Sequence, residues 1–180
     1  RMWEAEDGKE MSAARLRTID WTQRNRDNFD RVVIACDSGP SFRKAKVEEY
    51  KAGRTNPGAA YFEQRRMTLE RLRADGCILI DGPAVEGGHA EADDVLGWLA
   101  AAYVKHTIGL ADDAIVNWTL RIVSGDADLE QLICDADAID LLKPTEREPW
   151  KEAQVLAARG VTPSKVPHLK ALCGDKSDNY

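Results

Sequence analysis

Short apolar runs that each end near an aspartate recur along this chain, and they limit its possible folds more than any other feature. The runs are residues 31–36 (RVVIAC), 77–80 (CILI) and 119–123 (TLRIV), and each is followed by Asp within three residues. Apolar runs of this length that are closed by turn-forming residues are typical of strands buried in a parallel sheet. The sequence therefore predicts a sheet whose carboxyl edge carries acidic side chains.

Helical patterns separate and follow these runs. An alternation of strands and helices predicts an α/β fold with a mostly parallel sheet and helices on both of its faces. A weaker strand pattern occupies residues 138–142. The helical patterns cover residues 9–28, 59–74, 91–105, 129–133, 148–159 and 164–172.

Length and composition predict one domain, or one and a fraction, with a substantial core, because the chain has 180 residues of which 43% are hydrophobic. The first residues are charged, whereas a signal peptide would have an apolar segment there. No run approaches the roughly 18 apolar residues of a membrane span. We therefore expect a cytoplasmic protein. The four cysteines are widely spaced, which argues against a zinc site and favours reduced thiols.

Charge is distributed unevenly along the chain. The formal net charge of −6 argues against a general nucleic-acid binder, which would carry a basic surface. Residues 41–73 nevertheless contain nine Lys or Arg against four Asp or Glu, whereas residues 81–140 contain thirteen Asp or Glu against two Lys or Arg. A basic segment with interleaved aromatic residues therefore precedes a strongly acidic one.

The acidic segment contains Glu91-Ala92-Asp93-Asp94 directly before an apolar run at residues 95–104. Negative charge is favourable in the first turn of a helix, so a solvated helix start accounts for this stretch taken alone. Glu91 and Asp94 are three residues apart and would share a helix face. Repulsion among these neighbouring carboxylates would be relieved by a bound cation.

Further carboxylates fall at strand ends and loops, where open α/β sheets bind their ligands. Each has a plain alternative: Asp37 as a turn former, Asp126 and Asp128 as helix caps, and Asp175 and Asp178 as solvated loop residues. If the sheet brings them together, the cluster would suit hard divalent cations, Mg²⁺ or Mn²⁺, which prefer oxygen ligands. Two such ions beside basic and aromatic side chains would suit phosphodiester hydrolysis.

Four sequence blocks stand in a distinctive order. They are FRK and EYKAGR within residues 42–54, EADDV at residues 91–95, IVSGDADLEQL at residues 122–132 and LCGDKSDN at residues 172–179. In this order they resemble the 5′-nuclease family, which includes flap endonucleases, phage 5′–3′ exonucleases and the 5′-nuclease domain of bacterial DNA polymerase I. A lone EADD is a weak signal, whereas the ordered set is specific.

The resemblance implies a fold, an activity and a metal centre. The fold would be a PIN-like three-layer α/β sandwich with a mostly parallel sheet and a helical arch region. The activity would be hydrolysis of DNA at 5′ ends or flaps with two Mg²⁺ or Mn²⁺ ions, as in DNA replication and repair. The implied metal ligands, direct or through water, are Asp37, Glu91, Asp93, Asp94, Asp126, Asp128, Asp175 and Asp178.

The resemblance also implies residues that handle DNA. Lys51 and Arg54 would lie at the base of the arch and act in catalysis by stabilising the scissile phosphate. Arg43 and Lys44 would contact the DNA backbone, and Tyr50 would belong to the same DNA-binding set. The helix at residues 59–74 would form part of the arch.

The family pattern sets expectations about the ends and domains of the chain. The family begins with an Asp-bearing strand, and Arg1-Met2-Trp3 resembles the segment after that strand, so we expect the first metal-binding Asp to be absent here. The family continues past Ser-Asp-Asn into a helix–hairpin–helix segment that grips duplex DNA and binds K⁺, whereas this chain stops at Tyr180. We expect residues 1–145 to form the nuclease core, residues 146–180 to begin the C-terminal helical region, and the protein to be a monomer.

Two other interpretations remain open. The expected absence of the first Asp is compatible with a DNA-binding fold that has lost catalysis. A PIN-type ribonuclease would share the acidic cluster, although it would not account for the FRK and EYKAGR block. RNA therefore remains a possible substrate beside DNA.

Overall fold

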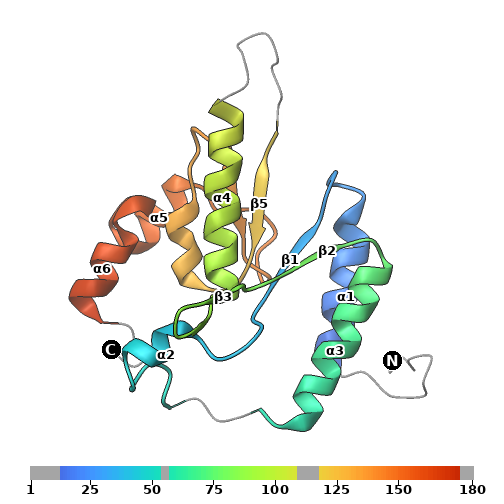
Figure 1. Cartoon of the computed structure of the whole chain (residues 1–180). Helices are drawn as coiled ribbons and strands as arrows, with labels where there is room; N and C mark the ends of the chain where they lie inside the picture. Colours follow the sequence, from blue (N-terminus) through green and yellow to red (C-terminus); the bar gives the residue numbers. More distant parts are fainter. Residues whose placement is uncertain (1–12, 54–56, 109–117, 175–180) are drawn as a thin grey trace. The chain divides into compact units, whose positions relative to one another are not determined.

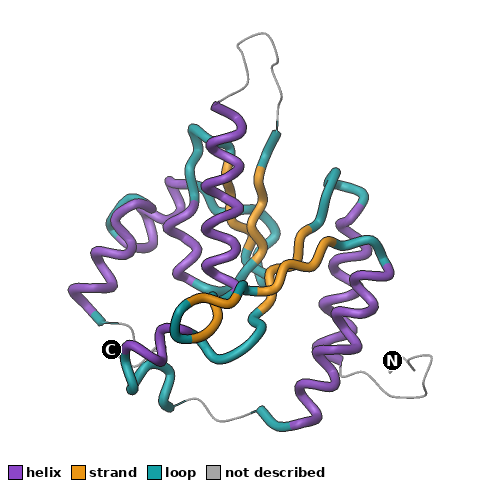
Figure 2. The backbone as a smooth tube through the Cα atoms, in the orientation of Figure 1, coloured by secondary structure: helices purple, strands orange, loops and turns teal. Residues whose placement is uncertain are grey.

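The computed structural model describes residues 13–53, 57–108 and 118–174. The chain divides into two units, residues 1–36 with 53–81 and residues 37–52 with 82–180. Figure 2 shows helices and strands alternating along the chain.

The first unit contains two helices and a parallel pair of strands (Figure 1). The strands β1 (Val33–Cys36) and β2 (Ile78–Asp81) pair in register, with Cys36 opposite Asp81. The helices α1 (Ala13–Arg26) and α3 (Ala59–Ala74) lie against each other. Gly76 has a φ of 85°, a left-handed conformation that glycine adopts without strain and that ends α3 before β2 begins. The buried core consists of Ile19, Met67, Leu72 and Cys77.

The second unit contains another parallel pair, β5 (Leu120–Val123) and β6 (Ile139–Leu142). The long helix α4 (Ala92–Ile108) contacts β5 and the 3-10 helix η1 (Ala127–Leu132). The chain continues from β6 into α5 (Glu152–Arg159), η2 (Pro163–Lys165) and α6 (Val166–Cys173). Since both units pair their strands in parallel and contain helices, the predicted α/β class is confirmed.

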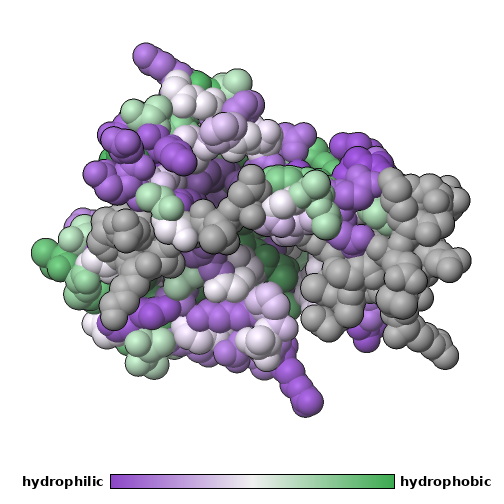
Figure 3. Space-filling view, turned by 90° about the horizontal axis from the view of Figure 1, so that it is seen from below, coloured by the Kyte–Doolittle hydropathy of each residue, from purple (hydrophilic) through white to green (hydrophobic). Residues whose placement is uncertain are grey.

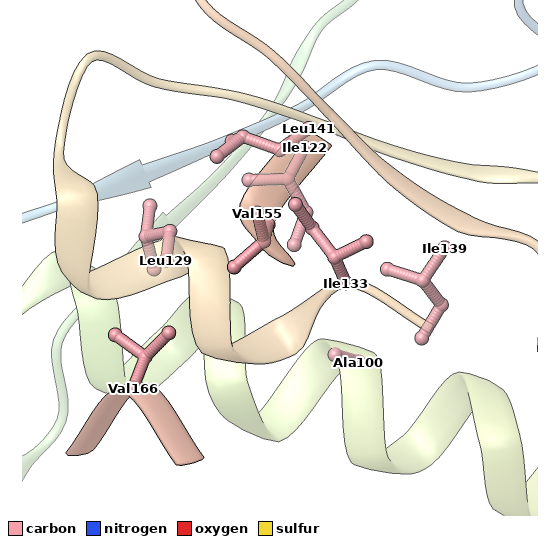
Figure 4. Close-up of a cluster of buried hydrophobic side chains, with 8 residues drawn as sticks. All are labelled: Ala100, Ile122, Leu129, Ile133, Ile139, Leu141, Val155 and Val166. Atoms are coloured by element: carbon pink, nitrogen blue, oxygen red, sulfur yellow. The ribbon is translucent and has the colours of Figure 1, made fainter. Parts of the chain in front are cut away.

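Eight buried apolar side chains form the core of the second unit (Figure 4). Leu141 and Ile122 from the paired strands lie near Val155 of α5 and Ile133, which follows η1. Leu141 and Val155 are completely buried. Burial of apolar area stabilises at about 25 cal/mol per Å², so this cluster holds η1, α4 and α5 against the strands. Its other members are Ala100, Leu129, Ile139 and Val166.

Two predicted helices begin at different residues from those expected. The predicted helix at 129–133 is a 3-10 helix that starts at Ala127, because the Asp126 side chain accepts a hydrogen bond from the Asp128 amide. The predicted helix at 148–159 starts at Glu152. Trp150 instead pairs with Leu141 through two backbone hydrogen bonds of 3.1 and 2.7 Å, which keep that part of the chain extended.

Two small elements were not expected from the sequence. The short helix α2 (Phe42–Lys46) begins after Ser41, whose hydroxyl accepts a hydrogen bond from the Arg43 amide. The glycine-rich loop forms a hairpin of β3 (Ala84–Val85) and β4 (Gly88–His89). Both elements belong to the second unit, and both lie in the segments that carry the candidate site.

Hydrophilic residues form most of the coloured surface on the face drawn in Figure 3, and hydrophobic residues occur there in smaller groups. Among the described helices, none is long and apolar enough to cross a lipid bilayer.

Candidate active site

The start of α4 is held by two carboxylates from different parts of the sequence. The Glu91 carbonyl accepts a hydrogen bond from the Val95 amide (3.2 Å), so Glu91 stands at the helix boundary. The Asp94 carboxylate accepts from the Glu91 amide (2.9 Å), and the Asp37 carboxylate accepts from the Ala92 amide (2.8 Å). Amides in the first turn have no partner within the helix, and these carboxylates satisfy two of them. Asp37 is thereby joined to the Glu91–Asp94 stretch across 55 residues of sequence.

Cationic side chains from the basic segment contact the acidic start of α4. The Arg43 guanidinium donates two hydrogen bonds to the Asp94 carboxylate, at 2.7 and 2.6 Å, and a third to Glu91 at 3.1 Å. The Lys51 ammonium and the Tyr50 hydroxyl each donate to Glu91 at 2.7 Å. The opposite charges of the two segments thus meet at one place in the second unit.

These contacts change the pKa values of the groups involved. The Arg43 guanidinium lowers the pKa of Asp94, chiefly through its hydrogen bonds. Burial disfavours the charged form of Glu91, but the hydrogen bonds from Lys51 and Tyr50 outweigh it and lower its pKa. Burial likewise opposes the charge on Lys51, yet bonding to Glu91 raises the pKa of Lys51 to about 12. Glu91, Asp94 and Lys51 are therefore all charged at neutral pH.

Asp126 and Asp128 lie just beyond the end of β5. The Ser124 hydroxyl accepts a hydrogen bond from the Asp126 amide (3.1 Å), and the Asp126 carboxylate accepts from the Asp128 amide (2.9 Å). Asp126 therefore caps η1, which was the alternative to metal binding that the sequence offered for this residue. The Asp128 carboxylate forms an ion pair with Lys170 of α6.

Asp93 lies in a different electrostatic environment from its two acidic neighbours. Burial raises its pKa to about 6, and the charges of Asp126, Asp37 and Asp128 add to the increase. These four carboxylates come from three separate segments, and the other three are close enough to Asp93 for their charges to act on it. The fold thus brings together acidic groups that the sequence places 91 positions apart.

The hairpin β3–β4 packs tightly on the loop that carries Asp37. The His89 amide donates to the Pro40 carbonyl at 2.9 Å, and the His89 imidazole contacts the Ser38 hydroxyl at 3.0 Å. A Cβ atom at Gly88 would lie 2.6 Å from the Pro40 carbonyl oxygen, so a side chain cannot fit there without a shift of backbone. This close approach positions the loop after β1 beside the start of α4.

The predicted DNA-binding residues differ in their surroundings. Lys44 on α2 is exposed, as a phosphate-binding residue would be. Tyr50 is only 8% exposed, and its hydroxyl is directed to Glu91, so its ring presents little surface for stacking. Arg43 is held by carboxylates of the site. Three predicted site residues, Arg54, Asp175 and Asp178, lie outside the described residues.

The donor chemistry of the cluster fits a hard cation. All the predicted ligands are carboxylates. Burial is the main cause of the raised pKa of Asp93, and the charges of Asp126, Asp37 and Asp128 add to it. A divalent cation would relieve that repulsion. Across residues 13–53, 57–108 and 118–174, no three acidic, His or Cys side chains are already spaced to hold one ion. In this structure Lys51, Arg43 and Lys170 neutralise Glu91, Asp94 and Asp128 instead.

Sequence reasoning did not find two residues that complete this arrangement. Ser124 supports the Asp126 amide, and its position within the SGDAD block was an available signal. Lys170 pairs with Asp128 across 42 residues, and no local pattern indicates that contact.

Asp93→Asn is expected to stabilise the cation-free protein at alkaline pH. The folded protein holds the Asp93 proton more tightly than the unfolded chain does, because the pKa rises from 3.8 to about 6 on folding. The stability that this proton contributes is fully present below the pKa of Asp93 in the unfolded chain, and it is lost as pH rises through the pKa of Asp93 in the folded protein. Asp93 is half-buried, so solvent screens part of this effect. At about pH 8 asparagine should raise the free energy of unfolding by on the order of 1 kcal/mol, and Tm by about 2–4 °C; at about pH 3 it should change neither.

Asp94→Asn is the matched control for this measurement. Asp94 neighbours Asp93 but is held by the Arg43 fork, so its neutralisation should lower Tm under the same conditions. Thermal unfolding in EDTA, followed by circular dichroism at both pH values, compares the two variants. A decrease in Tm for Asp93→Asn at alkaline pH would contradict the inferred repulsion.

Comparisons with known proteins agree with these features. Residues 3–160 match the family described as 5′–3′ exonuclease, N-terminal resolvase-like domain. DNA polymerase I of Bacillus caldotenax is 34% identical over 151 residues, and DNA polymerase I of Lactococcus lactis subsp. cremoris is 33% identical over 152 residues. These matches cover 82% and 83% of this chain, and the chain spans 16% of the length of each polymerase.

Solved structures show the same fold. A flap endonuclease of bacteriophage T5, in a complex with DNA and metal ions, aligns with a TM-score of 0.65 at 20% identity. The alignment covers 92% of this chain and 60% of the phage chain. A second structure of the phage protein, co-crystallised with metal ions, aligns with a TM-score of 0.60 at 21% identity, and covers 96% and 62% of the two chains. The PIN-like α/β fold expected from the sequence is thereby confirmed.

Proposed function

This chain belongs to the family of 5′–3′ exonuclease N-terminal, resolvase-like domains, and on that premise we propose that it hydrolyses phosphodiester bonds of DNA at 5′ ends or flaps. One observation carries the proposal. Burial raises the pKa of Asp93 to about 6, and Asp37, Asp126 and Asp128 lie close enough to Asp93 for their charges to add to the increase. Such a cluster beside Lys51 suits phosphoryl chemistry with divalent cations.

The carboxylates of the cluster would hold Mg²⁺ or Mn²⁺, most simply two ions. When bound, such ions lower the pKa of a coordinated water and offset charge on the leaving oxygen. Asp37, Asp93, Asp126 and Asp128 are the ligands that the electrostatics supports. Glu91 and Asp94 would bind directly or through water, and Asp175 and Asp178 are proposed from the sequence resemblance alone.

The other residues would orient these groups and bind DNA. Tyr50 and Lys51 hold Glu91, and Arg43 holds Asp94, so the acidic side chains have defined directions before substrate arrives. The Lys51 ammonium would bind the scissile phosphate, together with Arg54. Exposed Lys44 would bind the phosphate backbone.

We propose that α3 contributes to the helical arch, that residues 1–145 form the nuclease core, and that residues 146–180 open the C-terminal helical region. The protein would act as a monomer on DNA, with RNA as a second possible substrate.

A 5′-labelled DNA flap tests the proposal directly. The full-length protein with Mg²⁺ is expected to cut the flap, and a 3′ flap of the same sequence serves as the control. Flap binding in EDTA without cleavage in Mg²⁺ or Mn²⁺ would indicate a DNA-binding fold without catalysis. Cleavage of a matched RNA flap in place of the DNA flap would indicate a ribonuclease.

A further inference from the structure

Glu130 of η1 is a completely buried carboxylate, with 0% of its residue surface exposed. It accepts a hydrogen bond from the Lys143 ammonium at 2.8 Å and two from the Arg159 guanidinium at 2.8 and 2.9 Å. Lys143 directly follows β6, and Arg159 is the last residue of α5. One carboxylate therefore joins three elements of the second unit.

The Lys143 ammonium has a second partner. It lies 3.2 Å from the centroid of the Trp150 ring. The negative face of an aromatic ring attracts a cation. The Arg159 side chain remains 38% exposed. Lys143 thus reaches Glu130 from the face of the Trp150 ring, and Arg159 reaches it from the protein surface.

Stability alone is a poor explanation for this arrangement. Removing a carboxylate from water costs several kcal/mol, and apolar residues of similar volume often replace buried ion groups without loss. Leu129 and Ile133 on either side already bury apolar surface against the core. Apolar contact is non-directional, however, whereas three charge-assisted hydrogen bonds fix the rotation of η1 about its axis.

The rotation of η1 decides where two acidic side chains lie. Asp126 caps η1 and Asp128 lies in its first turn, two residues before Glu130. The Asp128 amide is bound to the Asp126 carboxylate at 2.9 Å, so the pair moves as a unit with the helix. A change in the orientation of η1 would displace both carboxylates together.

We infer that Glu130, anchored by Lys143 and Arg159, is a positioning residue that sets the orientation of Asp126 and Asp128 for cation binding. This inference rests on the proposed function, since it takes these two carboxylates as ligands of a divalent cation. Glu130 is not one of the proposed metal ligands, and it would act through the orientation of η1.

Direct Mn²⁺ binding by Glu130→Gln in the full-length protein tests the inference. The Gln amide replaces one carboxylate oxygen by an N–H donor that faces a cation and removes the negative charge, so the anchor is weakened while the volume is kept. We expect Mn²⁺ affinity, measured by calorimetry without DNA, to fall about 10- to 100-fold, as when groups that orient metal ligands are changed. Flap affinity in EDTA should remain that of the wild type.

Asp140→Asn is the matched control. Buried Asp140 accepts hydrogen bonds of 2.8 and 2.7 Å from Arg121 between β5 and β6, and this pair is separate from Lys143 and Arg159, the two cations that bind Glu130. Its loss should lower Tm while Mn²⁺ affinity stays at the wild-type value. An equal loss of Mn²⁺ affinity in both variants would attribute the effect to general destabilisation and overturn the inference.

A triple variant covers the case in which Glu130→Gln does not fold. Glu130→Leu with Lys143→Met and Arg159→Leu replaces the ion group by apolar side chains, and it should fold yet bind Mn²⁺ more weakly. Wild-type Mn²⁺ affinity in the triple variant, or in a folded Glu130→Gln, overturns the inference. Wild-type protein that binds Mn²⁺ but cuts no flap overturns the proposed nuclease function alone, and wild-type protein that binds no Mn²⁺ overturns both.

Discussion

Asp126→Asn in the full-length protein is expected to lower 5′-flap cleavage by about 100- to 1000-fold, as the loss of one charge-stabilising group does in other active sites. Asparagine retains the side-chain oxygen that accepts the Asp128 amide at 2.9 Å, and it caps helices as well as aspartate does. The substitution therefore removes a negative charge from the cluster and leaves η1 in place. Tm in EDTA should not fall, because one source of repulsion on Asp93 disappears.

Asp135→Asn provides a control of the same chemistry. The Asp135 carboxylate also satisfies a helix-start amide, that of Glu152 at 3.3 Å, but it precedes β6 instead of following a strand. Cleavage by this variant should equal that of the wild type. Single-turnover cleavage of a labelled flap in Mg²⁺, with flap binding in EDTA measured in parallel, compares the two. If Asp126→Asn cuts at the wild-type rate, Asp126 does not belong to the site.

Lys51→Met is expected to lower kcat by about 100-fold, because a fixed positive charge near the scissile phosphate stabilises the transition state more than the bound substrate. The Lys51 side chain is 22% exposed, and its ammonium lies 2.7 Å from Glu91. Its backbone has a φ of 55°. This left-handed conformation is rare for residues other than glycine, and it persists where the surrounding structure imposes it. The turn thus holds Lys51 at a defined place beside the cluster.

Two further variants separate charge from backbone strain and from DNA affinity. Lys51→Gly should relieve the left-handed strain and have a higher Tm than Lys51→Met, yet it should be as slow as Lys51→Met. Lys44 is exposed on α2, and Lys44→Met should raise KM with kcat unchanged. It should also reduce the slope of log binding constant against log salt concentration by about one released counterion. Steady-state kinetics on the flap at several salt concentrations distinguish these effects. A kcat for Lys51→Met equal to that of Lys44→Met would contradict a catalytic role for Lys51.

Local patterns were sufficient for the α/β class and for placing Asp37 and Asp126 after strands and Asp93 and Asp94 at a helix start. The apolar run before Asp37 forms β1, which ends at Cys36, and the run before Ser124 forms β5, which ends at Val123. Such runs are read correctly because strand burial and turn chemistry depend on adjacent residues. The helix predicted at residues 59–74 has those bounds in the structure for the same reason.

Elements that depend on distant partners were not predicted. Residues near Trp150 were expected to be helical, but pairing with Leu141 keeps them extended. The hairpin β3–β4 depends on contact with the Asp37 loop, which lies more than 40 residues earlier. Hydrogen bonds of this kind override local propensity because a tertiary contact satisfies the same backbone groups.

The sequence by itself determined which residues carry charge, that Glu91, Asp93 and Asp94 stand at a helix start, and that Asp37 and Asp126 follow strands. It did not distinguish among these acids. Tertiary structure alone decided that Arg43 holds Asp94, that Lys51 and Tyr50 hold Glu91, and that burial, with the charges of Asp126 and Asp37, raises the pKa of Asp93. The reason is physical: ionisation and hydrogen bonding depend on distances through space, and the fold sets those distances between residues that lie far apart in the chain.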